Sequence, residues 1–303
     1  MTYLKTFFTL ILLCTVLSAC DKNETDFSEA TNITGTGDYI FSSYEPFSKK
    51  PITCYYHIPE MANSISPILI ALHGAGRDAD NMRDYLIEKA DEKNFIVIAP
   101  EFSSIYFPGS DAYNLANIFE DGDDPNPETI NPEEEWTFSV IDPLFEDFKN
   151  RIGNTVPGYD IFGHSAGSQL LHRYLIFKPD AKFNRVVCAA AGWYTMPDQT
   201  VDFPYGLGAS PEESSDLSDV FFRDVTVIVG ENDVDPNSFN LRHTPGADAQ
   251  GNNRVQRAQY FFTESSDIAE NSGLNYNWAY SIVPNAGHEG DANAVYAAEL
   301  LYP

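Results

Sequence analysis

Basic residues are scarce in this chain. Its 303 residues include 18 Lys and Arg against 45 Asp and Glu, which gives a formal net charge of −27. Proteins that bind nucleic acid need clustered Lys and Arg to contact phosphates. We therefore expect no nucleic-acid partner. The acidity favours solubility outside the cell and disfavours polyanionic substrates.

Cysteine is also scarce. Of the four cysteines, Cys14 and Cys20 lie near the N-terminus, and Cys54 and Cys188 lie in apolar, strand-like stretches. Their spacing fits neither a disulfide framework nor a metal site. We expect no metal and interpret Cys54 and Cys188 as buried free thiols. A pairing between these two remains open in an oxidising compartment.

Long apolar runs are absent after the first 20 residues. Lys5 precedes an apolar stretch over residues 7–17, which ends in Leu17-Ser18-Ala19-Cys20. A basic start, an apolar core and small residues at the end are typical of a signal peptide, here residues 1–19. The apolar core is too short to span a bilayer.

The last four residues of this segment resemble a bacterial lipobox. That resemblance implies that Cys20 becomes lipidated and anchors the protein to an extracytoplasmic membrane surface. Ordinary secretion with cleavage near Ala19 is the alternative. Residues 20–37 are then expected to form a polar tether, and residues 38–303 a single folded domain.

Within residues 38–303, short apolar runs alternate with amphipathic ones. The pattern predicts strands over 39–44, 52–58, 68–72, 95–99, 159–162, 185–190, 225–229 and 278–283, and helices over 80–92, 133–152, 166–177, 253–271 and 291–301. Such alternation indicates an α/β fold with a mostly parallel sheet flanked by helices on both faces. We expect the first two strands to be antiparallel edge elements. A ligand site is expected beyond the carboxyl ends of the parallel strands.

A long acidic loop over residues 103–132 interrupts this rhythm. It contains Glu120-Asp121-Gly122-Asp123-Asp124 and many Pro, Gly and Asn residues. Loops of this length are usually functional or mobile. The acidic cluster lacks the ligand spacing of a recognised calcium loop, so we interpret it as a solvated excursion rather than a metal site.

The pentapeptide Gly163-His164-Ser165-Ala166-Gly167 has the pattern G-x-S-x-G of a nucleophile elbow. It follows a predicted strand and begins a predicted helix, which is the context that the motif requires. The sharp turn lifts the serine side chain out of the sheet, and small residues two positions away avoid clashes. We therefore predict that Ser165 is a nucleophile.

A serine hydroxyl needs a base, and the base needs an acid to orient it. His288 follows the last predicted strand and comes after the serine in the chain, as this architecture requires. His243 is a weaker candidate, and we expect His164 to point away from Ser165. For the acid we favour Asp233, which follows the strand over 225–229. Its neighbours Glu231 and Asp235 remain alternatives, and Asp235 could instead cap a turn.

Acyl transfer also needs donors for the developing oxyanion. The backbone N–H of Ala166, directly after the nucleophile, supplies one. The other is expected in Leu72-His73-Gly74-Ala75-Gly76, where we favour the N–H of Ala75 over those of Gly74 and Gly76. No Lys-Ser/Thr pair follows this turn, so a phosphate-binding role is disfavoured.

Taken in order, His-Gly after an apolar strand, Gly-His-Ser-Ala-Gly, Gly-Glu-Asn-Asp and Gly-His before the final helix resemble the α/β-hydrolase superfamily over about residues 50 to 303. The His-Gly-Ala-Gly start resembles secreted polyhydroxybutyrate depolymerases and feruloyl and acetylxylan esterases. The resemblance implies a serine hydrolase that cleaves a small or polymeric ester without a cofactor. Unlike many depolymerases, this chain has no cysteine-rich framework and no evident substrate-binding module.

Aromatic residues follow the predicted strand over 185–190. Trp193 and Tyr194 could line the cleft and contact a bulky substrate group, or they could only pack the loops. Two other functions remain open for the whole chain. One is a serine peptidase with the same catalytic residues, and the other is a non-catalytic cell-surface binding lipoprotein.

Overall fold

The computed structural model describes residues 33–303, so the predicted signal peptide, Cys20 and most of the tether lie outside the described residues. An eight-stranded sheet runs through the molecule in the order β1-β2-β4-β3-β5-β6-β7-β8. The strands are β1 (Gly35–Phe41), β2 (Ile52–Ile58), β3 (Ile68–Leu72), β4 (Ile96–Glu101), β5 (Tyr159–His164), β6 (Phe183–Ala189), β7 (Asp224–Gly230) and β8 (Trp278–Val283). The pairs β1–β2 and β2–β4 are antiparallel, and all other pairs are parallel.

β2 has the predicted bounds, and the first two strands are antiparallel as expected, but β1 differs from the predicted strand over 39–44. β1 begins at Gly35, before residue 38 where we expected the domain to begin, and β2 lies between β1 and β4 instead of at an edge. Gly35–Phe41 pairs residue by residue with Ile52–Ile58. Pairing with a neighbouring strand, which a single run of sequence does not reveal, therefore sets these bounds.

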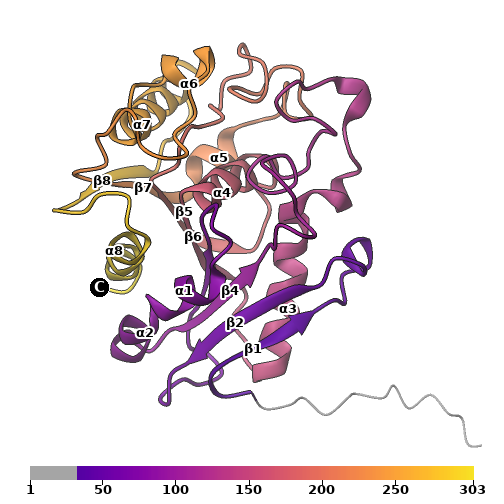
Figure 1. Cartoon of the computed structure of the whole chain (residues 1–303), viewed down its shortest axis with the longest axis vertical. Helices are drawn as coiled ribbons and strands as arrows, with labels where there is room; N and C mark the ends of the chain where they lie inside the picture. The colour runs from indigo at the N-terminus through magenta and orange to yellow at the C-terminus, as the bar shows by residue number, and fades with distance from the viewer. Residues whose placement is uncertain (1–32) are drawn as a thin grey trace, which may run out of the picture.

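Helices cover both faces of the sheet (Figure 1). One apolar cluster joins the sheet to α3 (Ile141–Ile152), α4 (Ala166–Phe177), α5 (Ser218–Phe222) and α7 (Arg254–Asn271). A second cluster, on the other face, joins it to α1 (Ala79–Asp84), α2 (Ile87–Lys93) and α8 (Gly290–Leu301). The remaining helical segments are α6 (Pro245–Ala249) and four short 3-10 turns at Glu45–Phe47, Pro127–Thr129, Glu133–Glu135 and Thr137–Val140. This is the predicted α/β architecture.

Two of the predicted helices are interrupted. The stretch 80–92 is divided into α1 and α2 at Tyr85 and Leu86, and the side chain of Leu86 is buried. In the stretch 133–152 the α-helix begins only at Ile141. Trp136 is extended there, and its indole N–H donates to the carbonyl of Asn131 at 3.0 Å. Burial of Trp136 therefore overrides the local helical preference.

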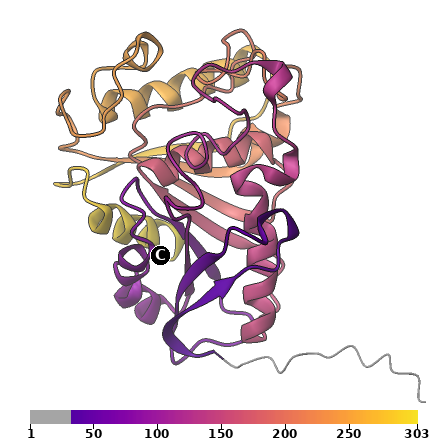
Figure 2. The ribbon, with the colours of Figure 1, turned by 45° about the vertical axis from the view of Figure 1, so that its right-hand side comes forward.

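The long loop is only partly solvated. Phe107, Tyr113 and Phe119 are buried in the core, and Phe119 forms a bridge with Ile130, so the apolar half of the loop packs against the domain. The acidic run at 120–124 is mostly exposed, and Asp123 forms an ion pair with Arg242 at 2.6 Å. The upper part of Figure 2 shows these loops above the carboxyl ends of the parallel strands. Over residues 33–303, no group of His, Cys, Asp and Glu side chains is arranged to hold a metal ion.

Cys54 and Cys188 are buried free thiols, as predicted. Burial raises the pKa of the Cys188 thiol to about 12, which leaves it un-ionised at neutral pH. A membrane-crossing helix would need a long apolar stretch, and none of the helices in the described part of the chain meets that requirement.

Candidate active site

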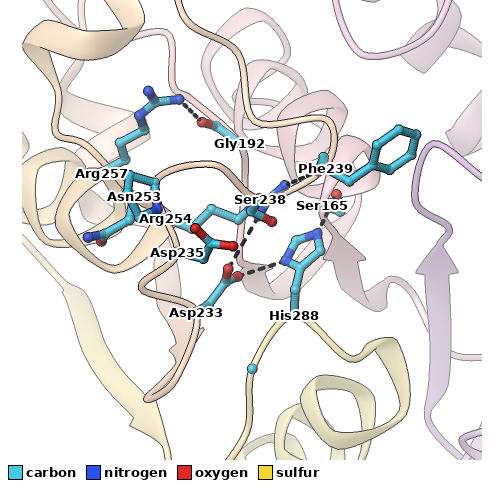
Figure 3. A network of polar contacts seen from close by, with 12 residues as sticks. Ser165, Gly192, Asp233, Asp235, Ser238, Phe239, Asn253, Arg254, Arg257 and His288 are labelled. Atoms are coloured by element: carbon cyan, nitrogen blue, oxygen red, sulfur yellow. Dashed lines mark hydrogen bonds and ion pairs between the residues drawn. The ribbon is translucent and has the colours of Figure 1, made fainter.

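Three loops at the carboxyl edge of the sheet carry the residues of the candidate site. Ser165 follows β5, Asp233 follows β7 and His288 follows β8. Because parallel strands end at the same edge, side chains far apart in the chain meet there. Figure 3 shows the imidazole of His288 between the side chains of Ser165 and Asp233.

The turn at Ser165 has the strained geometry that the motif predicts. Ser165 has φ 55° and ψ −114°, outside the regions that non-glycine residues normally occupy. A Cβ atom at Gly163 would lie 2.5 Å from the carbonyl oxygen of Gly167. A Cβ atom at Gly167 would lie 2.6 Å from the carbonyl oxygen of His73 and nearer still to that of Leu72. Gly163 therefore lets the end of β5 approach the start of α4, and Gly167 lets α4 pack against the end of β3.

His288 makes one hydrogen bond with each of its two ring nitrogens. Its Nδ1 atom lies 2.7 Å from Oδ2 of Asp233, and its Nε2 atom lies 3.0 Å from Oγ of Ser165. A carboxylate acceptor places the proton on Nδ1, which leaves Nε2 free to accept the serine proton. The Asp233 side chain is 3% exposed, whereas that of His288 is 28% exposed. The imidazole of His288 is therefore partly open to the cavity, whereas the carboxylate of Asp233 is enclosed.

Asp233 stays ionised although it is buried. Burial raises the pKa of its carboxyl group, but the hydrogen bond from His288 and the positive charges of His288 and Arg254 outweigh this effect and hold the pKa below its ordinary value. The carboxylate can thus stabilise the positive charge that His288 gains when it takes a proton.

The other candidates for base and acid have different partners. Asp235 accepts from the backbone N–H of Asn237 at 2.8 Å and so caps a turn. Glu231 accepts from the backbone N–H of Asn285 at 2.8 Å. His243 is 47% exposed and pairs with Asp248. Of these residues and Asp233, only Asp233 contacts His288 in the described part of the chain.

The loop after β3 lies opposite the serine. Ala75 lines the space in front of Ser165 together with Gly74, and Ala166 begins α4 directly behind the serine. In the described residues, the backbone N–H groups of Ala75 and Ala166 donate no hydrogen bond to another protein group. Both amides are therefore available as hydrogen-bond donors at the site.

His73 holds this loop in place. Its Nδ1 atom lies 2.9 Å from the carbonyl oxygen of Gly74, and its Nε2 atom accepts from the backbone N–H of Phe102 at 3.0 Å. Burial lowers the pKa of His73 to about 4, so the ring is neutral and keeps one N–H and one acceptor. His73 thus ties the loop to the segment after β4.

His164 is closer to the site than the sequence suggests. We expected it to point away from Ser165, yet its ring centroid lies 4.8 Å from that of His288 and the residue lines the cavity in front of Ser165. Burial, together with the nearby charge of His288, lowers the pKa of His164 to about 3. His164 is therefore a neutral neighbour of the base.

Two cavities meet at Ser165. The first, of about 360 Å³, extends toward His164, His288 and Phe239. The second, of about 420 Å³, extends toward Gln169, Trp193 and the long loop. Three arginines line the second cavity (Arg77, Arg242 and Arg254), whereas no Asp or Glu of residues 33–303 lines it. Arg242 and Arg254 are paired with Asp123 and Asp233, whereas Arg77 donates to backbone carbonyls, so the cavity lining is more positive than the acidic composition of the chain suggests.

The two aromatic candidates for substrate contact differ in location. Trp193 lines the second cavity, and the guanidinium groups of Arg173 and Arg242 lie 4.4 and 4.7 Å from the centroid of its indole. Tyr194 is fully buried and stacks on Phe261 with a centroid distance of 4.3 Å. The structure thus places Tyr194 in the core, which corrects the expectation that it lines the cleft.

Arg254 is a residue of the site that sequence reasoning missed. It lines both cavities, is 2% exposed, and donates to Oδ1 of Asp233 at 3.2 Å. It is also the first residue of α7, after the N-cap residue Asn253. A cation at the positive end of a helix dipole is unfavourable. An arginine at the predicted start of this helix is therefore the sequence signal that could have identified Arg254 as a residue of the site.

Several solved structures share this fold. Poly(aspartic acid) hydrolase-1 from Sphingomonas sp. KT-1 is 35% identical, with a TM-score of 0.83 over 89% of this chain and 99% of that chain. A poly(3-hydroxybutyrate) depolymerase from Bordetella parapertussis is 27% identical, with a TM-score of 0.83 over 90% of this chain and 92% of that chain. An S-formylglutathione hydrolase from Agrobacterium tumefaciens shares the fold, with 14% identity, a TM-score of 0.52, and 89% and 94% of the two chains covered. No protein-family model and no curated protein matches the sequence.

The fold and these likenesses define a hydrolytic enzyme of the carboxylesterase-like class. The chain belongs to the α/β-hydrolase family that includes poly(aspartic acid) hydrolase-1 of Sphingomonas.

Proposed function

We propose that the protein is a serine esterase that cleaves carboxylic esters through an acyl-enzyme intermediate. Ser165, His288 and Asp233 are its catalytic triad, and the N–H groups of Ala75 and Ala166 form its oxyanion hole. The observation that carries the proposal is the 3.0 Å contact between Ser165 Oγ and His288 Nε2, with Nδ1 of the same ring 2.7 Å from Asp233. This is the geometry of an activated serine nucleophile.

The reaction follows from these positions. Ser165 Oγ attacks the carbonyl carbon while His288 Nε2 takes the hydroxyl proton, and the two amides stabilise the oxyanion. The tetrahedral intermediate collapses, the ester C–O bond breaks, and His288 returns the proton to the leaving alcohol. Water then attacks the acyl group with His288 as base, and the acid leaves while Ser165 regains its proton.

Hydrolysis of short p-nitrophenyl esters by wild-type protein and by Ser165→Ala tests this proposal. We expect the substitution to abolish turnover while the circular dichroism spectrum stays unchanged, because it removes only one oxygen. Undiminished turnover by the variant would refute the assignment. The same pair assayed with peptide anilides tests the serine peptidase alternative, which requires anilide cleavage with esters ignored.

A second candidate function is hydrolysis of a polymer that carries carboxylates. Two observations support it: the second cavity has three arginines and no lining acid, and the 35%-identical relative is a poly(aspartic acid) hydrolase. Poly(aspartic acid) is a polyamide with a carboxylate on each repeat, and an arginine fork binds a carboxylate with two hydrogen bonds. The same Ser165 would then attack an amide carbonyl.

Product analysis separates the two candidates. Wild-type protein is incubated with poly(aspartic acid), with poly(3-hydroxybutyrate) and with small neutral esters, and Ser165→Ala is the control for each. Shortening of the polyamide only in the presence of Ser165 supports the second candidate. Ester hydrolysis without shortening of the polyamide supports the esterase proposal and contradicts the second candidate.

We also propose that the chain is a lipoprotein, anchored through Cys20 to a bacterial membrane on its extracytoplasmic side. The support is the Leu17-Ser18-Ala19-Cys20 ending after an apolar segment. Labelled palmitate is expected to enter the wild-type protein and not Cys20→Ala. Equal labelling of both, or of neither, would remove the proposal.

A further inference from the structure

The carboxylate of Asp233 is shared between two donors. Its Oδ2 atom lies 2.7 Å from Nδ1 of His288, and its Oδ1 atom accepts from Nη1 of Arg254 at 3.2 Å. The side chains of Asp233 and Arg254 are 3% and 2% exposed. Rotation of the carboxylate away from His288 would therefore also break a buried ion pair, and an uncompensated buried charge is strongly unfavourable.

Arg254 occupies a position that is unfavourable for a cation. It begins α7, where the helix dipole is positive, and its Nε atom is buried without a hydrogen-bond partner in the described residues. Packing alone would be satisfied by an apolar side chain. The negative charge of Asp233 is what compensates the guanidinium here.

The same guanidinium also binds the loop between β7 and α6. Its Nη1 atom donates to Ser238 Oγ at 2.7 Å, and its Nη2 atom donates to the carbonyl of Phe239 at 3.2 Å. Ser238 and Phe239 line the first cavity, and the Phe239 side chain is 88% exposed at its mouth. Figure 3 shows Arg254 between Asp233 and these two loop residues. One side chain thus connects the acid of the site with the wall of the cleft.

We propose that Arg254 is a positioning residue for the reaction: it fixes the carboxylate of Asp233 toward His288 and fastens the Ser238–Phe239 segment of the cleft to that carboxylate. This inference rests on the proposed function, since it assigns Asp233 as the acid of the triad. Arg254 acts through Asp233 and takes no part in bond making.

The proposal has a consequence for the pH dependence of catalysis. The positive charge of Arg254 opposes protonation of His288 through the shared carboxylate, so its removal favours the inactive imidazolium form. Six other ionisable residues lie around Asp233 and His288. They are His164 on β5, whose ring is neutral, Glu231 and Asp235 on the loop after β7, Glu289 and Asp291 at the start of α8, and Asp78 before α1. All of these are unchanged in an Arg254 variant, and the acidic limb of the kcat/KM profile therefore moves to higher pH.

Two substitutions separate the charge of Arg254 from its geometry. Arg254→Met removes the charge and keeps a long side chain, whereas Arg254→Lys keeps the charge and loses the fork that reaches both Asp233 and the loop. Arg257→Met is the matched control. Arg257 lies one turn further along α7, is equally buried, and donates to the carbonyl of Gly192 and to Asp248 rather than to Asp233.

The experiment is the kcat/KM profile for a neutral ester from pH 5 to 9, with folding checked by circular dichroism. We expect Arg254→Met to move the acidic limb up by about one pH unit and to lower kcat by about 10- to 100-fold. Arg254→Lys is expected to keep the limb and to lose part of kcat. Arg257→Met is expected to lower Tm without moving the limb.

An unmoved limb in Arg254→Met, or wild-type kcat in Arg254→Lys, would overturn the proposal. If Arg254→Met does not fold, the kcat of Arg254→Lys alone decides. Asp233→Asn in the same series distinguishes two kinds of failure. Full activity of Asp233→Asn contradicts the proposed triad, whereas an inactive Asp233→Asn with an unmoved limb in Arg254→Met contradicts only the role of Arg254.

Discussion

The Oγ atom of Ser165 lies 3.0 Å from Nε2 of His288, although the two residues are 123 positions apart in the chain. They meet because β5 and β8 are parallel strands of one sheet and end at the same edge. Two other features maintain the contact: the strained backbone at Ser165 raises its side chain, and Asp233 orients the imidazole.

Asp233→Asn should lower kcat for a neutral ester by about 10³- to 10⁴-fold, because an amide in this place favours the wrong tautomer of His288. Steady-state kinetics at pH 7.5 measures the loss. Asp235→Asn is the matched control, since Asp235 caps a turn through the N–H of Asn237 and does not contact His288. Equal losses in both variants would show that the acid has been misassigned.

Gly167→Ala should destabilise the fold by more than about 3 kcal/mol or prevent folding, because the new methyl group meets the backbone oxygens of Leu72 and His73. Gly76→Ala is the comparison: its methyl group would meet only the carboxylate of Asp78 at 3.2 Å, and that side chain can move. We expect Gly76→Ala to lower the free energy of unfolding by less than about 1 kcal/mol. Urea unfolding measures both, and equal losses would contradict the close packing of the elbow.

Stability should fall as the pH is lowered from 7 to 5. Burial lowers the pKa of His164 to about 3 and that of His73 to about 4, so between the unfolded value near 6.5 and these folded values the unfolded state binds more protons. Each residue should therefore lower the free energy of unfolding by about 2 kcal/mol at pH 5 relative to pH 7. His172 is also fully buried, and burial lowers its pKa well below the ordinary value, so it adds to the same loss. His164→Gln should therefore reduce the total loss by about one third, as measured by urea unfolding at both pH values.

Arg242→Gln should weaken the hydrolysis of carboxylate-bearing substrates selectively. Arg242 lines the second cavity beside Trp193, and loss of one charge-assisted contact there should lower kcat/KM by about 10-fold for an anionic ester. The neutral ester with the same acyl group should be hydrolysed almost as well as by wild type, and added salt should narrow the difference. Lys182→Gln, which removes a surface ion pair with Glu146, is the control for net charge. A parallel loss on both esters would argue against carboxylate recognition in this cavity.

The sequence was sufficient for the parts of the site that depend on local order. Gly163 and Gly167 around Ser165 define a turn, and residues directly after strands had to lie at the same edge of a parallel sheet. The sequence was insufficient where partners come from distant segments. Tyr194 follows a strand as Trp193 does, yet only contact with Phe261 on α7 shows that it is buried.

Charge illustrates the same limit. The net charge of −27 suggested that anionic substrates are disfavoured, but composition does not record where the few arginines lie. Arg77, Arg242 and Arg254 come from three separate segments and meet in one cavity. Arg254 was missed because its importance depends on Asp233, which lies 21 positions away across a loop.

Covalent labelling with a fluorophosphonate, followed by intact-protein and peptide mass spectrometry, tests the central claim most directly. Fluorophosphonates react with serines that a neighbouring base has activated, so we expect one adduct on Ser165, loss of esterase activity in proportion to labelling, and no adduct in Ser165→Ala. Full labelling of Ser165→Ala, or unlabelled wild-type protein that still hydrolyses esters, would contradict the account.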